Sequence, residues 1–389
     1  MTQRPIYLDY QATTPTDPRV VEAMLPWFTE DFGNPHSAHH VYGRTAAEAV
    51  EAARGTIAAM IGADPREIVF TSGATESNNL AIKGAARFLQ GRKSHLITLA
   101  SEHKCVLEAH RRMEREGYRL TVLAPGPSGL VELERLAAAI EPETALVSVM
   151  AVNNEIGVIQ PMAQIGALCR ERGVLYHCDA AQAAGKIPLD VEAMGIDLLS
   201  LSGHKMYGSK GIGVLYVRRR PRVRLDPLFD GGGQERGHRS GTLPTPLCVG
   251  LGEAARLAME LMEEEAERLG AFNRRFRARL AEAIPDATIH GDLDRRFAGN
   301  LNVGIPGLDA ETLIAALPEL AVSTGSACTS ASVEPSYVLR ALGLPDEAAR
   351  GGLRIGFGRF TTEAEVERAA DLLIAAAERL RGERSEAAE

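Results

Sequence analysis

One lysine of the chain, Lys205, lies where a reactive amine would be useful. It is surrounded by hydroxyl, glycine and imidazole groups in residues 202–208 (SGHKMYG) and follows the apolar run 197–201. The chain uses arginine for most of its basic side chains, and its lysines are Lys83, Lys93, Lys104, Lys186, Lys205 and Lys210. A lysine amine can be desolvated into a nucleophile that condenses with an aldehyde, whereas a guanidinium stays protonated. The ordinary alternative is a lysine in a surface turn.

A carboxylate and a hydroxyl-rich turn favour the chemical interpretation. Asp179 ends the strand-like run 174–178, and ligands of open α/β sheets bind at the carboxyl ends of strands. Residues 70–79 (FTSGATESNN) begin a helical stretch, and small residues at a helix start expose backbone amides to a phosphate. Pyridoxal 5′-phosphate needs an acid at its pyridine nitrogen and a lysine at its aldehyde. Asp179, Lys205 and this turn together predict that cofactor.

The elements that must position these residues alternate along the chain. Apolar runs predict strands at 68–70, 95–99, 120–123, 146–150, 174–178, 198–201 and 213–217, and helical periodicity is clear at 79–90, 105–117 and 162–172. Such alternation indicates an α/β fold with a mostly parallel sheet and helices on both faces. A long charged helical stretch at 252–283 is interpreted as the bridge to a smaller α+β domain.

We expect a large cofactor-binding domain at 15–255, a smaller domain formed by 1–14 and 256–381, and a polar tail at 382–389. A chain of 389 residues is long enough for about two or three domains. Its net charge of −8 argues against a dedicated nucleic-acid binder. The amino terminus lacks the apolar core of a signal peptide, and no apolar run is long enough to span a bilayer.

The cysteines predict reduced thiols in a cytosol rather than a disulfide framework, because their number is odd and no two form a CxxC pair. They are Cys105, Cys169, Cys178, Cys248 and Cys328. Cys328 stands among small and polar residues with no apolar periodicity to bury it, as a reactive thiol would. The other cysteines are interpreted as structural or incidental. A zinc site formed by His36, His39, His40 and a cysteine has the wrong spacing.

With these motifs the chain resembles the pyridoxal-phosphate-dependent cysteine desulfurases of the NifS/IscS type, group I of the class V aminotransferase family. The similarity extends from residues 6–15 (IYLDYQATTP) to 358–362, and its most specific part is the cysteine-bearing run 323–331 (STGSACTSA). The resemblance implies an aspartate-aminotransferase-like fold, fold type I of these enzymes. It also implies a cytoplasmic homodimer that converts L-cysteine to L-alanine and leaves a persulfide on Cys328. That sulfur would pass to an iron–sulfur scaffold protein and other acceptors. Gly356 departs from the family pattern, where a serine is common.

The resemblance also implies a role for each residue of the site. Lys205, His103 and Cys328 would be catalytic, and Asn154 and Arg354 would bind the substrate, whose carboxylate suits an arginine fork. The cofactor would be held by Gly73, Ala74, Thr75, His103, Asp179, Gln182, Ser202, His204, Lys205 and, from the neighbouring subunit, Thr242. No resident metal is implied, and Cys328 is a candidate only for transient iron–sulfur ligation.

Other interpretations stay open on the residues alone. For His103 a capping or loop role is favoured, and Arg354 is equally a member of a surface salt bridge. The arginines at 218–224 form either an exposed basic strip that docks an acidic protein or a solvated strand end; they are Arg218, Arg219, Arg220, Arg222 and Arg224. An aminotransferase, a selenocysteine lyase and a catalytically inactive interaction subunit are the rival functions.

Overall fold

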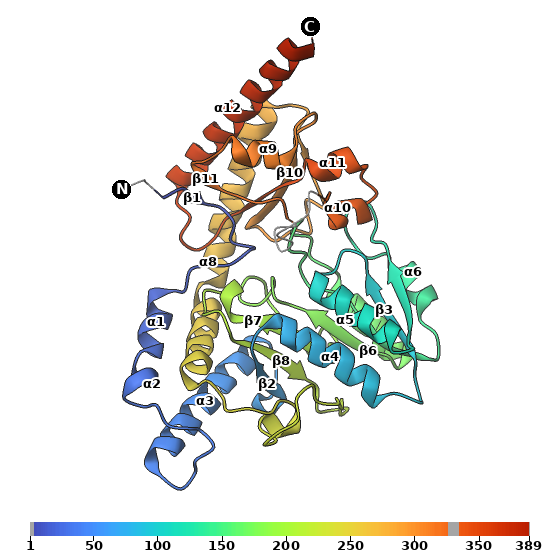
Figure 1. Cartoon of the computed structure of the whole chain (residues 1–389), viewed down its shortest axis with the longest axis vertical. Coiled ribbons are helices and arrows are strands. Elements are labelled where there is room, and N and C mark those ends of the chain that lie inside the picture. The colour runs from blue at the N-terminus through green and yellow to red at the C-terminus, as the bar shows by residue number, and fades with distance from the viewer. Residues whose placement is uncertain (1–3, 326–333, 389) are drawn as a thin grey trace.

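A seven-stranded sheet forms the larger part of the molecule, with strand order β2-β8-β7-β6-β5-β3-β4 (Figure 1). The computed structural model describes residues 4–325 and 334–388. The strands are β2 (Ile68–Thr71), β3 (His95–Leu99), β4 (Arg119–Leu123), β5 (Thr144–Ser148), β6 (Leu175–Asp179), β7 (Leu198–Ser202) and β8 (Gly213–Val217). All neighbours from β7 to β4 pair in parallel, while β8 is antiparallel to both β7 and β2. The predicted α/β fold is confirmed.

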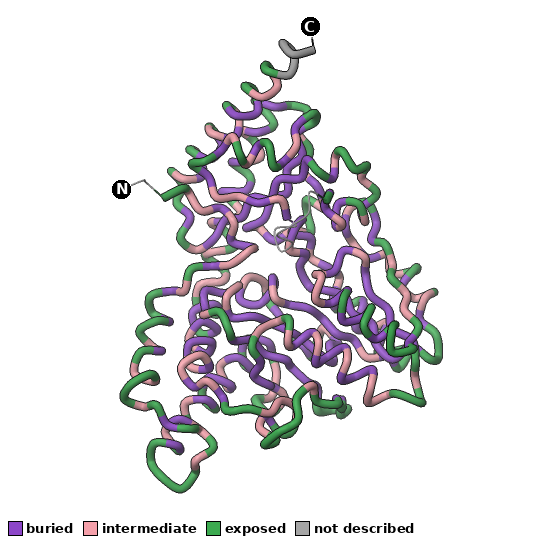
Figure 2. The backbone as a smooth tube through the Cα atoms, viewed as in Figure 1, coloured by how far each residue is buried: buried purple, intermediate pink, exposed green. Residues whose placement is uncertain are grey.

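Helices cover both faces of this sheet because its side chains alternate between two apolar layers. Val69 and Leu198 pack with the helices α4 (Ala74–Phe88) and α5 (Lys104–Arg115). Phe70 and Leu199 belong to the larger core on the opposite face. That core includes α3 (Val41–Met60), α7 (Met162–Arg172) and part of α8 (Thr245–Ala283). The buried strands therefore lie inside the larger part of the molecule, between the two layers of helices (Figure 2).

A single helix, α8, runs from the large sheet to the smaller part of the molecule (Figure 1). It begins at Thr245, earlier than the predicted 252, because Pro246 lies in the first turn, where a missing N–H costs no helical hydrogen bond. The helix α4 likewise begins at Ala74 rather than 79, since its hydroxyl-rich first turn is already helical.

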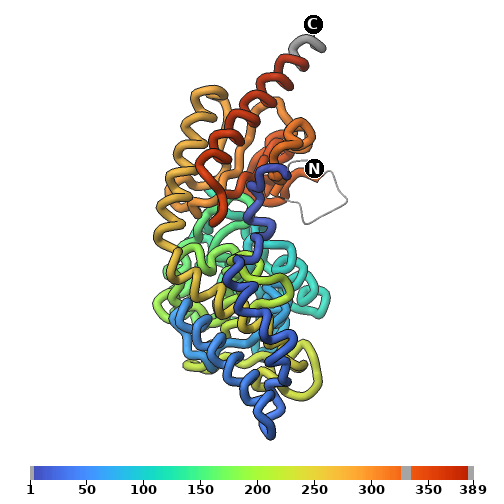
Figure 3. The backbone as a smooth tube through the Cα atoms, turned by 90° about the vertical axis from the view of Figure 1, so that its left-hand side faces the viewer, coloured from blue at the N-terminus to red at the C-terminus, as the bar shows by residue number. Residues whose placement is uncertain are grey.

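Two small sheets lie around the far half of α8. The antiparallel sheet has the order β12-β10-β9 and consists of β9 (Thr288–Ile289), β10 (Asn300–Gly304) and β12 (Leu353–Gly356). The other pairs β1 (Ile6–Tyr7) with β11 (Leu320–Ala321) in parallel, so the chain starts in this part before it passes along the molecule to α1 (Figure 3). The remaining helices are α1 (Pro18–Met24), α2 (Pro26–Thr29), α6 (Leu133–Ala139), α9 (Ala310–Ala315), α10 (Tyr337–Ala341), α11 (Asp346–Arg350) and α12 (Glu363–Ala388).

Within residues 4–325 and 334–388, no helix is both long enough and apolar enough to cross a membrane.

Candidate active site at the carboxyl edge of the sheet

The carboxyl ends of β6 and β7 bring Asp179 and Lys205 to one edge of the sheet. The two strands are parallel neighbours, with Asp179 opposite Ser200. After Ser202 the chain enters a short 3-10 turn, Gly203–Lys205, that carries the lysine. The turn before α4 reaches the same edge because Gly213 and Gly73 pack closely, and a Cβ on Gly213 would lie 2.6 Å from the Cα of Gly73.

Asp179 is held at both carboxylate oxygens. Oδ1 accepts a hydrogen bond from the backbone N–H of Ala181 at 2.9 Å, and Oδ2 accepts one from Nδ2 of Asn78 at 2.7 Å. Asp179 and Asn78 are both buried. Asn78 lies on α4, and no role was predicted for it. Its position within the phosphate-turn motif was the only available signal, because a buried amide on a helix has no distinctive pattern.

Lys205 and Gln182 meet at the same backbone segment near the amino terminus. The Lys205 amine donates to the carbonyl oxygens of Gln11 and Ala12, the latter at 2.8 Å. Nε2 of Gln182 donates to the same Gln11 carbonyl at 2.8 Å, while its Oε1 accepts from Lys186 at 3.1 Å. Burial, together with the nearby Lys205 charge, lowers the pKa of Lys186 to about 7.

The turn before α4 has the features of a phosphate site. Gly73 has a φ of 146°, which favours glycine, and within the described residues no side chain caps the helix start. A Cβ on Gly73 would lie 3.7 Å from Oγ of Ser202, so the bare glycine leaves space between the two. Ala74 follows as the first helical residue, and Thr75 is exposed. Backbone amides at such an uncapped helix start suit an anion.

His204 borders this turn as a neutral side chain. Its Nδ1 lies 3.1 Å from Oγ1 of Thr13. Burial, with a smaller contribution from the Lys205 charge, lowers the pKa of His204 to about 4. Without a ligand the histidine is therefore uncharged near neutral pH.

His103 is a helix cap, as the alternative interpretation held. Its Nδ1 accepts from the backbone N–H of Cys105 at 3.2 Å at the start of α5. The same nitrogen lies 3.0 Å from Sγ of Cys105, which in turn accepts from Nδ2 of Asn78 at 3.1 Å. The thiol of Cys105 thus connects His103 with Asn78, the neighbour of Asp179, which is in line with the structural side of the prediction for this cysteine. Proton transfer by His103 stays a prediction.

Arg354 on β12 forms the opposite wall and is not part of a surface salt bridge. It is 3% exposed, and its Nη2 pairs with Oδ1 of Asp9 at 2.7 Å. Its Nη1 donates to the Asn154 carbonyl at 3.1 Å. Nε of Arg354 and Oδ1 of Asn154 are buried without a hydrogen-bond partner among the described residues. Buried polar groups without a partner lower the stability of the fold unless a ligand forms hydrogen bonds with them. Their presence here is expected for a substrate site.

The chain on either side of residues 326–333 contacts one buried carboxyl group, that of Glu155. Ser336 Oγ lies 2.5 Å from Oε2 of Glu155, and a Cβ on Gly325 would lie 2.5 Å from the same oxygen. Burial raises the pKa of Glu155. The predicted nucleophile, Cys328, lies outside the described residues, and its role stays a prediction.

Thr242 is exposed and lies between η3 (Glu235–Gly237) and α8. This segment is anchored to the large sheet by Glu235, which accepts from the Phe70 N–H at 2.7 Å and forms a buried ion pair with Arg54 at 2.8 Å. The contact of Thr242 with a neighbouring subunit's cofactor remains a prediction.

The other cysteines and the arginine run divide into confirmed and wrong predictions. Cys169, Cys178 and Cys248 are fully buried, and burial raises the pKa of Cys169 and of Cys248 to about 12; their structural interpretation is confirmed. Arg218 was predicted to be exposed, but it is buried between Asp197 and Glu192. The rest of the run is exposed, namely Arg219, Arg220, Arg222 and Arg224.

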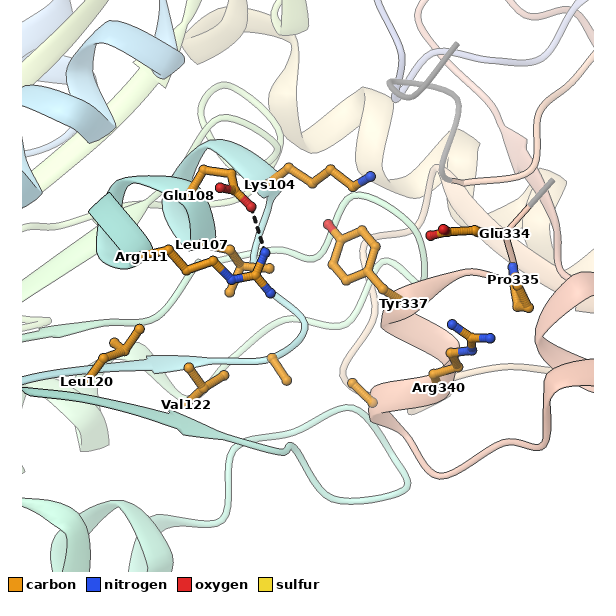
Figure 4. A pocket seen from close by; sticks show the side chains of 12 residues that line it. Lys104, Leu107, Glu108, Arg111, Leu120, Val122, Glu334, Pro335, Tyr337 and Arg340 are labelled. Atoms are coloured by element: carbon orange, nitrogen blue, oxygen red, sulfur yellow. Dashed lines mark hydrogen bonds and ion pairs between the residues drawn. The ribbon is translucent and has the colours of Figure 1, made fainter. Parts of the chain in front are cut away.

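A surface hollow of about 520 Å³ lies beside the site, between the β4 edge of the sheet and α10 (Figure 4). Lys104 and Tyr337 line it, and the Tyr337 hydroxyl donates to the Glu102 carbonyl at 2.9 Å. Glu108 and Arg111 in its wall pair with each other at 2.6 Å. None of the predicted site residues lines this hollow.

Comparisons with known proteins match almost the whole chain. The family model of the class V aminotransferases matches residues 6–369. Cysteine desulfurase IscS of Rickettsia felis is 58% identical over 377 residues, which are 97% of this chain and 92% of that protein. The protein of the same name from Rickettsia rickettsii is 57% identical with the same coverage. Of the solved structures, a NifS-like protein has a TM-score of 0.89 at 36% identity, covering 97% of this chain and 99% of its own. SspA in complex with cysteine has a TM-score of 0.80 at 42% identity, covering 92% and 99%.

Proposed function

This chain belongs to the class V aminotransferase family, and we propose that it is a pyridoxal 5′-phosphate-dependent cysteine desulfurase of the NifS/IscS type. The observation that carries the proposal is the meeting of Asp179, Lys205 and the Gly73 turn at one edge of a sheet. The relatives named cysteine desulfurase share more than half of their residues with it across nearly the full length. The fold is fold type I of these enzymes, as the resemblance implied.

The residues at the sheet edge fit the cofactor. When bound, pyridoxal 5′-phosphate supplies an aldehyde that captures amines and a ring that withdraws electrons. Asp179 would contact the ring nitrogen, and Lys205 would provide the amine for covalent attachment. Gln182 would contact the phenolic oxygen. The phosphate would be held by groups around the bare Gly73 turn: the amides of Gly73 and Ala74 and the side chains of Thr75, Ser202 and His204.

The chain's own groups then bind the substrate and move its protons. Arg354 and Asn154 would bind the carboxylate of L-cysteine, which satisfies their buried polar atoms. Lys205 Nζ and the His103 imidazole would carry protons to and from the substrate carbon. The Cys328 thiolate would attack the substrate sulfur. A sulfur–sulfur bond forms as the carbon–sulfur bond breaks, and the carbon takes a proton to give L-alanine.

A homodimer completes the proposal, with Thr242 reaching the neighbouring subunit's cofactor. Large apolar side chains are exposed between α1 and the start of α3, and a gathering of them is unusual for a surface that stays in water; they are Val21, Leu25, Phe28, Phe32, Val41 and Tyr42. The proposed occupant of this face is a second copy of the chain. Phe28→Glu should shift sedimentation towards a monomer, whereas Met259→Glu, at an exposed apolar residue elsewhere, should leave the dimer intact.

The proposal also includes the division of the chain into domains and the acceptors of the sulfur. We propose a division into domains at 15–255 and at 1–14 with 256–381, which the separation of the large sheet from the two smaller ones supports. The persulfide sulfur would pass to an iron–sulfur scaffold protein and other acceptors in the cytoplasm.

Purified protein mixed with L-cysteine tests the reaction class. A yellow protein that forms alanine and, with a reductant, sulfide, without any added keto acid, would support the proposal. Exchange that depends on a keto acid would indicate an aminotransferase, and activity confined to selenocysteine would indicate a lyase for that amino acid. A colourless protein that does not take up the cofactor would indicate an inactive interaction subunit.

Cys328→Ser separates the sulfur-transfer step from cofactor binding. The variant should keep the yellow colour and still respond spectrally to L-cysteine, because the cofactor residues are unchanged. Alanine and sulfide release should fall to background, since a hydroxyl is a far poorer nucleophile towards sulfur. Cys169→Ser provides the matched control and should keep most activity. Full activity of Cys328→Ser would place the nucleophile elsewhere.

A further inference from the structure

A chain of hydrogen bonds inside the large domain links Asp179 to His103. Nδ2 of Asn78 donates both to Oδ2 of Asp179 at 2.7 Å and to Sγ of Cys105 at 3.1 Å. Sγ of Cys105 lies 3.0 Å from Nδ1 of His103. Two amino acids, neither of which was predicted to have a role, thus connect two predicted members of the site.

The orientation of the Asn78 amide is fixed by its partners. An ionised carboxylate only accepts hydrogen bonds, so the NH₂ group of Asn78 must face Asp179. The amide oxygen then faces Nε2 of His177 at 3.1 Å. His177 must therefore carry its proton on Nε2, and its Nδ1, 3.1 Å from Oγ of Ser148, accepts from that hydroxyl. Each of the donors named above then has an acceptor.

The same orientation determines what the Cys105 thiol can do. Because the second amide hydrogen of Asn78 points to the sulfur, the sulfur is an acceptor there, and its own S–H can point to Nδ1 of His103. The backbone N–H of Cys105 also donates to this nitrogen, at 3.2 Å. A proton on Nδ1 would abolish this cap and present two donors to one sulfur. Both effects disfavour the Nδ1–H form of His103.

We propose that Asn78 and Cys105 are positioning residues that fix neutral His103 as its Nε2–H tautomer and couple it to the Asp179 carboxylate. The importance of this for turnover rests on the proposed function, in which His103 moves protons at the substrate. Nε2 would then be the nitrogen that exchanges protons with the reaction, while Nδ1 stays a permanent acceptor. The rings of His103 and His177 would both be held in one tautomer by the same asparagine.

Nuclear magnetic resonance of the holoenzyme labelled with ¹⁵N-histidine tests the tautomer directly. Two-bond proton–nitrogen correlations distinguish Nε2–H from Nδ1–H, and His103→Gln identifies the signals of His103. We expect the Nε2–H pattern in the natural protein and a mixture of tautomers in Cys105→Ala. Cys105→Ser should restore the single form, because a hydroxyl also donates. An Nδ1–H pattern in the natural protein, or an unchanged pattern in Cys105→Ala, would overturn the proposal.

Kinetics provide the second measurement. Loss of one hydrogen bond to His103 should lower kcat for alanine formation by about 2- to 10-fold in Cys105→Ala, with little change in KM, because substrate binding is elsewhere. Cys105→Ser should recover most of the rate, and Cys169→Ala is the matched control. An unchanged kcat in Cys105→Ala contradicts the coupling. The tautomer result requires no turnover, so absence of desulfurase activity in the natural protein would count against the proposed function alone.

Discussion

The two walls of the site differ in whether their buried polar groups have hydrogen-bond partners. At the edge of the large sheet, Asp179 is hydrogen-bonded at both oxygens and Lys205 donates to two carbonyl groups. At the face of the small antiparallel sheet, Nε of Arg354 and Oδ1 of Asn154 are buried without partners among the described residues. A buried polar group without a partner costs about 1–3 kcal/mol.

This difference indicates a division of labour. The large-sheet wall is organised before any substrate arrives, as a wall that holds a resident cofactor must be. The Arg354 wall contains a buried donor and a buried acceptor that a ligand would satisfy. We therefore interpret it as the part of the site that binds the substrate, which enters and leaves in each turnover.

Removal of the Lys205 amine should have the largest effect. Lys205→Ala should lower turnover by about 1,000-fold or more, because the amine that would attach the cofactor is lost. Some cofactor should remain bound without a covalent link, since Asp179 and the Gly73 turn are unchanged. Absorbance of the washed protein and alanine formation measure the two effects. Turnover equal to that of the natural protein would refute the assignment of Lys205.

Acid should weaken the large-sheet wall through His177. Burial lowers the pKa of His177 to about 3, whereas the unfolded chain takes up this proton near pH 6.5. Below about pH 6.5 the unfolded state therefore binds more protons, and stability falls as the pH falls. His177 alone should lower the free energy of unfolding by on the order of 3 kcal/mol between pH 7 and pH 4. Denaturant unfolding between pH 7 and 4 measures it.

His177→Asn should show a shallower decline of unfolding free energy with acid, whatever its stability at pH 7. The exposed His39 provides the control, and His39→Asn should keep the natural slope. Equal slopes in the His177 variant and the natural protein would mean that this histidine does not titrate on unfolding as described.

The Arg354 wall should respond in substrate affinity. Arg354→Gln should raise KM for L-cysteine by about 10- to 100-fold, because a charge-assisted pair with the carboxylate is lost. The cofactor absorbance should not change, since the other wall is intact. Arg368→Gln, which removes an exposed pair with Glu319, should leave KM unchanged. If the cofactor signal disappears in Arg354→Gln, the two walls are not independent.

Gly356 should give the smallest effect. A Cβ at this position would lie 1.9 Å from Oε1 of Gln11 and 2.9 Å from the Tyr10 amide nitrogen. Gly356→Ala should therefore destabilise the fold by about 1 kcal/mol, measured by urea unfolding. Shortening the neighbour in Gln11→Ser should recover part of this loss in the double variant. Additive losses would show that the Tyr10 backbone, rather than Gln11, sets the limit.

The large-sheet wall could be predicted from the sequence because its residues follow apolar runs directly. Asp179 and Lys205 stand at the ends of such runs, and the strands formed within two residues of the predicted limits. The contacts that hold them could not be predicted. Asn78 reaches Asp179 from a helix about 100 residues earlier in the chain, and no local pattern encodes that meeting.

The opposite wall was predicted through the resemblance rather than the residues. Arg354 alone was indistinguishable from a surface arginine, because its burial depends on Asp9, which lies at the other end of the chain. Arg218 was misjudged for the same reason. A run of arginines suggests an exposed strip, but Asp197 and Glu192 enclose the first of them.

The shared anchor at Glu155 has a consequence for how this fold can diversify. Gly325 and Ser336 both lie beside one carboxylate oxygen of Glu155. The two ends of the intervening segment are therefore held close together by a residue outside that segment. Doubling the length of such an intervening segment costs only about 0.6 kcal/mol of closure entropy. Insertions and deletions there should therefore cost the fold little, and an engineer could change the length of this segment around a retained Cys328 while leaving Glu155 and its two neighbours in place.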